Sequence, residues 1–418
     1  NENCMDFSEN ENADGDLEPE LPAGEKEQQN LMENKFSEEF LNYLENFRFT
    51  GDVWAIPEGT VVFPNEPLIT VRAPIIQAQL LETMLLLTTN HQSLIATKTS
   101  RIVKEAQGRP VMEFGARRAH GINAAVEGAR AAIIGGAIGT SCTLSAKEFN
   151  VPASGTMAHS WVQSFDSEYE AFKTYAEIYP DDCTLLIDTY NTIESGLPNA
   201  IKVFNEVLKP KGYKPKAVRL DSGDLAYLSK KVRKILDEAG YTECKICATN
   251  SLDEYLIKSL IEQDAKIDSF GVGENLITAK SEPVFGGVYK LVGIEKDTKI
   301  IPKIKVSENV VKVTNPGFKK VYRFYDNESQ KAIADVIALS DEIIDEREYM
   351  IFDPQNPWKK KLIKDYTIRE LQEKIFENGK LIYKSPTLEE IAKKSKKELN
   401  SIWEEVKRIE NPHKYYVD

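Results

Sequence analysis

The chain has 418 residues, of which 41% are hydrophobic and 28% are charged, a composition typical of a soluble globular protein with more than one domain. Its formal net charge of −13 argues against nucleic acid or an anionic membrane as the main partner, so any phosphate site must be a local basic pocket. Because no apolar run is long enough to span a membrane and no signal sequence stands at the N-terminus, the sequence predicts a cytoplasmic protein.

The N-terminal part of the chain predicts a mobile segment followed by an antiparallel sheet and helices. Residues 1–34 are acidic and poor in apolar side chains, which is typical of a poorly folded segment. Short β-branched and aromatic runs separated by Pro, Gly and Asn then predict antiparallel strands. The expected elements are a helix at 36–44, strands at 53–56, 60–63 and 68–72, a buried helix at 76–91 and a second helix at 93–105.

Strand–helix alternation begins near residue 111. The repeat of about 25–35 residues is typical of βα units in a parallel sheet. Polar residues fall at the C-terminal ends of the strands, where α/β barrels place their active sites. An open doubly wound sheet is the alternative, but no Gly-x-Gly-x-x-Gly turn follows a first strand. The expected strands are 184–188, 217–221, 245–250 and 267–271, and the expected helices are 196–208, 227–239 and 252–263.

After residue 282 the strand pattern returns, with strands predicted at 287–292, 300–305 and 320–325. We expect these strands to rejoin the N-terminal sheet, which makes the first domain discontinuous. Helices are predicted at 368–377 and 388–410. The predicted parts are a mobile segment 1–34, an open-faced α/β sandwich domain formed by 35–110 and 285–370, an α/β barrel at 111–284, and a helical segment 371–418.

The five cysteines are too few and too scattered for a disulfide framework. Cys244 and Cys247 have the spacing of a redox motif or half a zinc site, but no second pair follows them. Residues three apart in a strand point to opposite faces, so buried free thiols are predicted, and no structural zinc is expected.

Three short segments carry residues suited to phosphoryl or phosphoribosyl chemistry. Residues 155–160 hold His159, one of only four histidines, in a run of small residues. Residues 113–118 end in an Arg-Arg pair, and residues 218–224 contain Asp-Ser-Gly-Asp after an arginine. Imidazole, guanidinium groups and carboxylates would supply a nucleophile or base, phosphate contacts, and ligands for sugar hydroxyls or Mg²⁺. Each segment alone has a structural alternative: a turn histidine, a solvated arginine pair, or a turn with an N-cap.

Taken with residues 89–92, 270–273 and 287–291, these segments stand in the same order as in a known family. From about residue 36 to the C-terminus the chain resembles the nicotinate phosphoribosyltransferases, of the type II phosphoribosyltransferase family. The resemblance implies an irregular α/β barrel beside an open-faced sandwich domain, usually in a homodimer. It also implies transfer of phosphoribosyl from phosphoribosyl pyrophosphate to nicotinate, coupled to ATP hydrolysis and assisted by Mg²⁺.

By this resemblance, each matching residue has an expected role. His159 corresponds to the histidine that ATP phosphorylates, and Asp221 to a ligand of the ribose hydroxyls. Arg219 would lie under the pyridine ring or reach the substrate, Phe114 would form an aromatic wall, and Arg117 would contact a phosphate or carboxylate. The expected cradle of the 5′-phosphate consists of Asn250, Ser251, Gly271 and Gly273.

Ser141 is expected to decide which pyridine is used. Related nicotinamide enzymes carry Asp after the matching Gly-Thr, where a carboxylate would repel nicotinate, whereas the Ser141 hydroxyl can donate to it. The family's usual N-terminal segment, which contributes an aromatic to the pyridine site, is not found in residues 1–34. Nicotinamide or quinolinate transfer, or a catalytically lapsed phosphate-binding barrel, are the alternative functions.

Overall fold

The computed structural model describes residues 35–306, 315–354 and 356–418. The predicted mobile segment 1–34 lies outside the described residues. The chain divides into two compact units, Asn1–Thr50 and Gly51–Asp418. In the first unit, helix α2 (Glu38–Glu45) confirms the helix predicted at 36–44, and the Ser37 side chain caps it by accepting from the Phe40 N–H.

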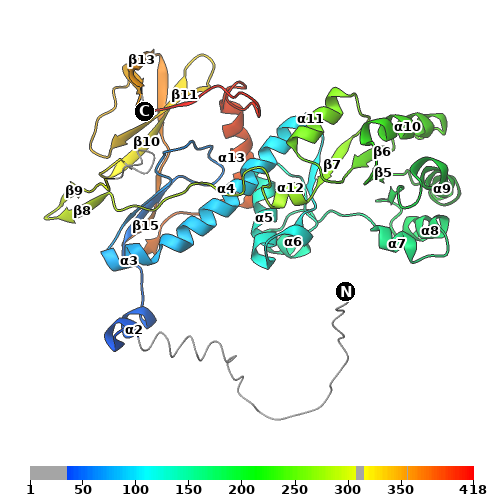
Figure 1. The fold of residues 1–418 in the computed structure, drawn as a ribbon, viewed down its shortest axis with the longest axis horizontal. Helices are drawn as coiled ribbons and strands as arrows, with labels where there is room; N and C mark the ends of the chain where they lie inside the picture. The colour runs from blue at the N-terminus through cyan, green and yellow to red at the C-terminus, as the bar shows by residue number, and fades with distance from the viewer. Residues whose placement is uncertain (1–34, 307–314, 355) are drawn as a thin grey trace, which may run out of the picture. The chain divides into compact units, whose positions relative to one another are not determined.

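A five-stranded parallel sheet lies in one half of the second unit, at right in Figure 1, in the order β3-β7-β6-β5-β4. Parallel one-residue bridges from Glu113 to Thr140 and from Thr140 to Ala153 prolong it beyond β3. The α/β class and the parallel sheet are confirmed, although the strand pairs of the described residues do not close it into a ring. Its strands are β3 (Val111–Glu113), β4 (Thr184–Leu186), β5 (Ala217–Leu220), β6 (Lys245–Ala248) and β7 (Ser269–Val272).

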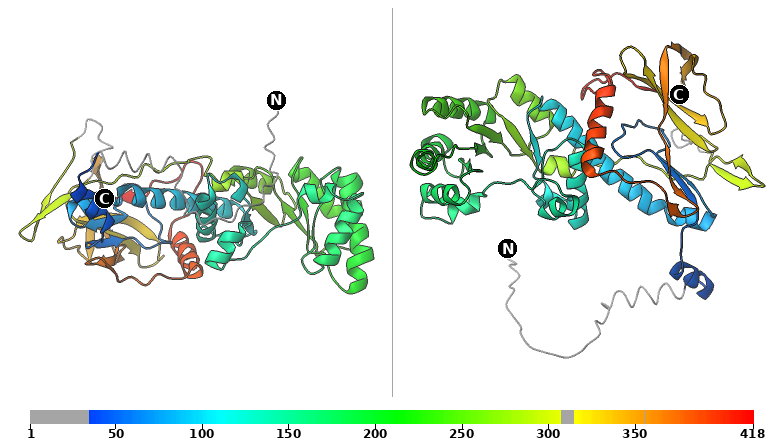
Figure 2. Two further views of the ribbon diagram at one scale, coloured as in Figure 1. Left: turned by 90° about the horizontal axis from the view of Figure 1, so that it is seen from below. Right: turned by 180° about the vertical axis from the view of Figure 1, so that it is seen from behind.

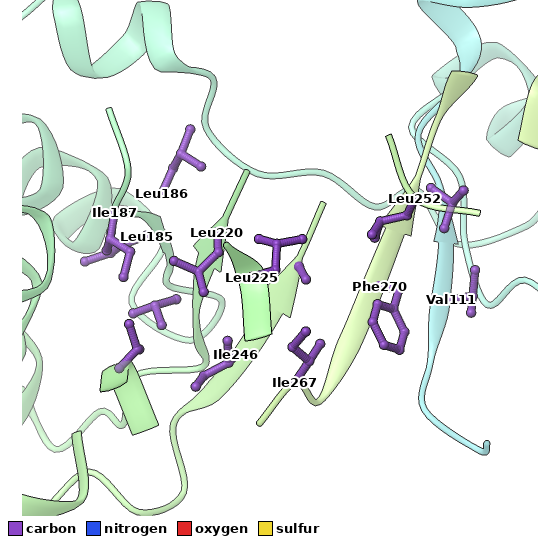
Figure 3. Packing of buried hydrophobic residues seen from close by; sticks show 14 of the residues in the cluster. Val111, Leu185, Leu186, Ile187, Leu220, Leu225, Ile246, Leu252, Ile267 and Phe270 are labelled. Carbon is purple, nitrogen blue, oxygen red and sulfur yellow. The ribbon is translucent and has the colours of Figure 1, made fainter. Parts of the chain in front are cut away.

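Apolar residues of these strands are buried because helices cover the sheet. Leu185, Ile246 and Phe270 are fully buried in one continuous core (Figure 3). Helices α10 and α11 begin where Asp224 and Asp253 accept from backbone N–H groups three residues ahead. The helices of this half are α5 (Ile122–Ile134), α6 (Thr143–Phe149), α7 (His159–Gln163), α8 (Glu168–Ile178), α9 (Leu197–Val203), α10 (Leu225–Glu238), α11 (Glu254–Glu262) and α12 (Glu274–Ile277).

The other half of the second unit contains sheets in which most strand pairs are antiparallel. In one of them, in the order β16-β15-β1-β2, strands from the two ends of the unit run side by side (Figure 2). Its strands are β1 (Asp52–Ala55), β2 (Ile69–Arg72), β15 (Glu373–Glu377) and β16 (Lys380–Leu381). A second sheet joins β10 (Lys319–Asp326), β11 (Ala332–Leu339), β14 (Tyr366–Glu370) and β17 (Tyr416–Val417). Two hairpins pair β8 (Gly293–Lys296) with β9 (Lys299–Pro302), and β12 (Glu348–Asp353) with β13 (Asn356–Lys364).

Several predictions for this half are wrong. The strands predicted at 287–292, 300–305 and 320–325 do not rejoin the N-terminal sheet. Strand β15 pairs with β1 instead, although it lies in a stretch predicted as the helix 368–377. That stretch is rich in helix-forming residues, but pairing with β1 and β10 overrides the local preference. Residues 287–292 form no strand. Helix α13 (Leu388–Ser401) ends well before the predicted residue 410, so the segment 371–418 is not helical throughout. The division of the chain into four parts otherwise stays a prediction.

The strand predicted at 60–63 is also wrong. The Thr60 N–H donates to the carbonyl of Pro57, and the Phe63 N–H donates to the Glu66 carboxylate, so turns occupy both ends of the stretch. The Phe63 ring instead stacks on Tyr415, with ring centroids 3.7 Å apart. Side-chain packing, not sheet pairing, explains its apolar pattern.

The helices predicted at 76–91 and 93–105 form a short α3 (Ile75–Leu80) and a continuous α4 (Glu82–Glu105). Helix α4 packs against α5 and α11. The stretch 76–91, predicted as a buried helix, is not buried: Leu80, Met84 and Leu87 are 45%, 57% and 68% exposed. None of the described helices is long and apolar enough to cross a membrane. The predicted buried thiols are confirmed, since Cys244 and Cys247 are free and buried.

A buried charge network ties the C-terminal helix to the second antiparallel sheet. Arg323 donates to both carboxylate oxygens of Asp335, at 2.8 and 2.6 Å, and both side chains are fully buried. The Glu398 carboxylate of α13 accepts a hydrogen bond from Arg369 at 2.6 Å and lies 3.5 Å from the Arg323 guanidinium. The pKa of Glu66 is raised from its ordinary 4.5 to about 10. Burial is the largest cause, followed by the hydrogen bond with Asp335 and the negative charge of Asp335.

The raised pKa of Glu66 predicts that the second unit loses stability as pH rises. Between pH 4.5 and about 10 the folded chain keeps a proton that the unfolded chain releases, so the free energy of unfolding falls with pH. The slope from this group is at most about 1.4 kcal/mol per pH unit. Glu66→Gln, which stays neutral, should unfold at a higher temperature than the wild type at pH 9 and show a flatter pH profile. Thermal unfolding at pH 6 and pH 9 tests this; an unchanged slope would refute it, and Glu377→Gln is the exposed control.

Candidate active site

Strand β5 delivers Arg219 and Asp221 to the carboxyl end of the sheet. The Arg219 guanidinium donates to the Thr249 hydroxyl at 2.9 Å, the Thr156 hydroxyl at 2.7 Å and the Asp221 carboxylate at 2.9 Å. Three partners fix this side chain, of which only 17% is exposed. The guanidinium carbon also lies 6.0 Å from the centroid of the Phe114 ring. Arg219 is therefore held in place beside the predicted aromatic wall.

The Asp-Ser-Gly-Asp motif divides between the site and the following helix. Asp221 faces the site, whereas Asp224 caps α10 by accepting from the Tyr227 N–H at 3.0 Å. Gly223 between them has φ +77°, a conformation that favours glycine. The motif is thus both the expected turn with an N-cap and a carrier of a site carboxylate.

His159 begins α7 and points its ring toward the carboxyl end of β5. Its Nδ1 lies 3.1 Å from the Thr189 hydroxyl, and its Nε2 lies 3.5 Å from Asp221. Thr189 follows β4, so residues that follow two neighbouring strands meet at this ring. The imidazole remains 39% exposed, which leaves an edge accessible to a ligand.

Asp221 is the centre of this cluster. Burial favours its neutral form, but the hydrogen bond from Thr249, the charge and hydrogen bond of Arg219, and the contact with His159 outweigh burial and lower its pKa. The carboxylate therefore stays ionised at neutral pH. An ionised, oriented carboxylate can accept hydrogen bonds from sugar hydroxyls or bind a cation.

Phe114 lies directly beside β7. Its N–H donates to the Val272 carbonyl at 2.7 Å. A Cβ at Gly271 would lie 2.5 Å from the Phe114 ring, and a Cβ at Gly273 would lie 3.0 Å from its carbonyl oxygen. Glycine at both positions therefore lets the Phe114 segment pack against the end of β7.

Asn250 and Ser251 follow β6 with φ values of +87° and +49°. Two consecutive non-glycine residues in the left-handed region are uncommon and store backbone strain. The Asn275 side chain donates to the carbonyls of Ser251 and Leu252, at 2.9 and 3.2 Å, and holds this turn. The predicted phosphate-binding residues thus occupy neighbouring strand ends, next to Thr249.

Arg117 and Ser141 are exposed, and no hydrogen bond or ion pair joins either side chain to the described residues around Asp221. Arg117 lies in the 3-10 turn Ala116–Arg118 and forms no hydrogen bond or ion pair with another described residue. Ser141 is fixed through its backbone, since its N–H donates to the Glu113 carbonyl at 2.9 Å. Their side chains are free to meet a ligand, and their roles stay predictions.

Four polar residues of the site were not predicted from the sequence. Thr156, Thr189 and Thr249 bind the predicted arginine or histidine through their hydroxyls, and Asp188 accepts from the Asp221 N–H at 2.8 Å and the Ser222 hydroxyl at 2.6 Å. All four lie at or just after strand ends or beside His159. Their position near the C-terminal ends of strands could have indicated a role in the site. Threonine is too common at such positions for this to distinguish them.

Among the described residues, no group of three or more His, Cys, Asp or Glu side chains is placed to hold a metal ion. One feature nevertheless suits a hard cation. The Oδ1 atom of Asp188 is buried without a hydrogen-bond partner in the described part of the chain. Asp188 and Asp221 adjoin each other at the strand ends, and Mg²⁺ commonly takes one or two carboxylates together with substrate phosphates.

A parallel sheet whose carboxyl end gathers an imidazole, an ionised carboxylate and a fixed guanidinium defines a phosphate-handling α/β enzyme. Three family models match this chain: the N-terminal domain of nicotinate phosphoribosyltransferase over residues 23–90, the nicotinate phosphoribosyltransferase family over 110–324, and its C-terminal domain over 318–418. The chain belongs to the nicotinate phosphoribosyltransferase family.

Individual relatives agree with this assignment. The nicotinate phosphoribosyltransferase of Bacillus subtilis is 47% identical over 409 residues, which cover 91% of this chain and 83% of that protein. The human nicotinic acid phosphoribosyltransferase structure has a TM-score of 0.81 at 25% identity and covers 94% of this chain and 85% of its own. A nicotinate-nucleotide pyrophosphorylase structure from Pyrococcus furiosus has a TM-score of 0.67 at 27% identity, covering 84% of this chain and 81% of its own. The predicted type II phosphoribosyltransferase fold is confirmed.

Proposed function

We propose that this enzyme joins nicotinate to phosphoribosyl pyrophosphate, forming nicotinate mononucleotide and pyrophosphate, with coupled hydrolysis of ATP. The observation that carries the proposal is the contact of Asp221 with both Arg219 and His159 at the strand ends. The names of the relatives support nicotinate as the acceptor. The reaction belongs to pyridine nucleotide biosynthesis.

In the transfer step the nicotinate ring nitrogen attacks C1 of the ribose, and the bond from C1 to pyrophosphate breaks. Asp221 would hold the ribose hydroxyls, so that C1 faces the incoming nitrogen. Phe114 would stack on the pyridine, with Arg219 fixed near its ring. Arg117 would contact an anionic group of the substrates, while Asn250, Ser251, Gly271 and Gly273 would surround the 5′-phosphate.

Mg²⁺ would enter with the phosphates of phosphoribosyl pyrophosphate and ATP. The unpaired Oδ1 of Asp188 and the ionised Asp221 fit the oxygen ligands that this ion prefers. When bound, the ion supplies positive charge against the leaving pyrophosphate. The chain's own contribution is to hold these carboxylates and Arg219 in fixed positions.

ATP is expected to phosphorylate His159. A ring nitrogen of His159 attacks the γ-phosphorus, and ADP leaves. Incubation with γ-labelled ATP should give an acid-labile, alkali-stable label that His159→Ala abolishes. Survival of the label in that variant would reject the assignment, and His413→Ala, on the C-terminal segment, is the control.

Ser141 should favour nicotinate over nicotinamide. Its exposed hydroxyl can donate to the substrate carboxylate, whereas Ser141→Asp would place a second carboxylate against it. The variant should lose at least about tenfold in the ratio of nicotinate to nicotinamide use, since a charge-assisted contact becomes a repulsive one. Competition between the two substrates measures the ratio. An unchanged ratio in a folded variant would show that Ser141 lies outside the pocket.

We also propose that the enzyme is a homodimer. The exposed apolar side chains of α4 adjoin an exposed apolar segment, including Val284 and Phe285, around a cavity of about 310 Å³. Contiguous exposed apolar surface of this kind marks an interaction site. A cytoplasmic location remains a prediction from the sequence.

A further inference from the structure

Glu113 is a buried carboxylate that the proposed reaction does not use. It ends β3, and its side chain has no exposed surface. In the described part of the chain no cation forms an ion pair with it, and burial raises its pKa although hydrogen bonds from Thr140 and Gly115 oppose that rise. Burying a carboxylate without a cation is costly, so the hydrogen bonds that Glu113 accepts must offset that cost.

Both carboxylate oxygens of Glu113 accept hydrogen bonds from neighbouring turns. The Gly115 N–H donates to Oε1, and the Thr140 hydroxyl donates to Oε2 at 2.6 Å. The Thr140 oxygen in turn accepts from the Cys142 N–H at 2.9 Å. Since the one hydroxyl hydrogen of Thr140 faces Glu113, the carboxylate acts as an acceptor on both sides.

The backbone of Glu113 joins the same two turns. Its N–H donates to the Gly139 carbonyl, and its carbonyl accepts from the Ser141 N–H, both at 2.9 Å. One turn carries Phe114 and Arg117, and the other carries Ser141. These residues are expected to surround the pyridine and its carboxylate. Asp221, the expected ligand of the ribose, instead accepts hydrogen bonds from Arg219 and Thr249, outside both turns.

We propose that Glu113 is a positioning residue that fixes the Phe114 and Arg117 turn against the Ser141 turn and thereby sets the affinity for nicotinate. Thr140 completes this joint by linking the carboxylate to the start of α6. The inference rests on the proposed function, because it takes nicotinate as the ligand between the two turns. The affinity for nicotinate then depends on this joint, whereas the affinity for phosphoribosyl pyrophosphate does not.

Glu113→Gln and Thr140→Val test the joint in the full chain. The glutamine amide can accept on only one side, and valine has no hydroxyl, so each change frees one turn. Each should raise the KM for nicotinate about tenfold, the cost of about one hydrogen bond, while kcat and the KM for phosphoribosyl pyrophosphate stay near wild type. The double variant should be no worse than either single one. Thr140→Ser, which keeps the hydroxyl, should behave as the wild type does.

Glu168→Gln is the matched control. Glu168 is also a buried carboxylate without a cation partner among the described residues, and it accepts from the Ser195 hydroxyl at 2.5 Å and from Asn199 at 3.0 Å, outside both turns. It should lower the melting temperature without changing either KM. Equal rises of both KM values in the Glu113 and Thr140 variants, or a nicotinate KM unaffected by Thr140→Val, would overturn the inference. If Glu113→Gln does not fold, the two Thr140 variants decide. Absence of nicotinate mononucleotide with the wild type would overturn the proposed function instead.

Discussion

Asp221→Asn is expected to lower kcat/KM for phosphoribosyl pyrophosphate by about ten- to hundredfold, which corresponds to about 1.5–3 kcal/mol for one charge-assisted bond to the sugar. The physical reason is the loss of the charge that the surroundings maintain: Arg219 and Thr249 both bind Oδ1, and His159 lies 3.5 Å from Oδ2. The amide can keep only part of this arrangement, because its nitrogen cannot accept from the ribose hydroxyls. Initial rates at varied phosphoribosyl pyrophosphate measure the effect.

Asp224→Asn is the control for this prediction. It removes the same charge from the same loop, but Asp224 caps α10, and asparagine caps a helix as well as aspartate does. This variant should keep nearly the wild-type kcat/KM. If Asp221→Asn left the dependence on phosphoribosyl pyrophosphate unaltered, Asp221 would serve only to order Arg219 and the turn.

Asp335→Ala is expected to destabilise the second unit by about 3–5 kcal/mol, because it leaves Arg323 fully buried without its main counter-ion. Glu398, at 3.5 Å, compensates only in part. Glu66 should compensate further, since removal of the Asp335 charge allows its carboxyl to ionise more readily. Chemical denaturation with a two-state test measures the loss.

A double variant and a surface pair complete the stability test. Replacing both members of the pair, as Asp335→Leu with Arg323→Met, should recover much of the stability that Asp335→Ala loses, because no unpaired charge remains buried. Glu295→Ala breaks the exposed pair with Arg72 and should cost less than about 1 kcal/mol. A small loss for Asp335→Ala, similar to that for Glu295→Ala, would show that water or rearrangement solvates Arg323.

The sequence predicted the parts of the fold that local patterns determine. Strands β4, β5, β6 and β7 appear at or close to the predicted ranges, because continuous apolar runs between turn residues are a local signal. The pairing of β1 with β15 could not be predicted in this way. It joins residues such as Trp54 and Lys374, which lie far apart in the chain, and no local pattern carries that information.

The candidate site shows the same division. His159, Arg219 and Asp221 were predicted from distinctive residue types in short motifs, and the structure brings them into contact. The sequence did not predict the hydroxyls that hold these side chains, which belong to Thr156, Thr189 and Thr249. A threonine becomes significant only once its neighbours in space are known. Glu113 stands in the same motif as Phe114, yet only the structure reveals that it joins two turns.

Product analysis with the purified protein tests the central claim most directly. Phosphoribosyl pyrophosphate, Mg²⁺ and either nicotinate or nicotinamide are supplied, with and without ATP, and nucleotides and phosphates are separated and quantified. The proposed function predicts nicotinate mononucleotide and pyrophosphate from nicotinate, more product when ATP is present, ADP and phosphate formed alongside it, and little product from nicotinamide. Nucleotide formation from nicotinamide in preference to nicotinate, or no nucleotide from nicotinate under any of these conditions, would contradict it.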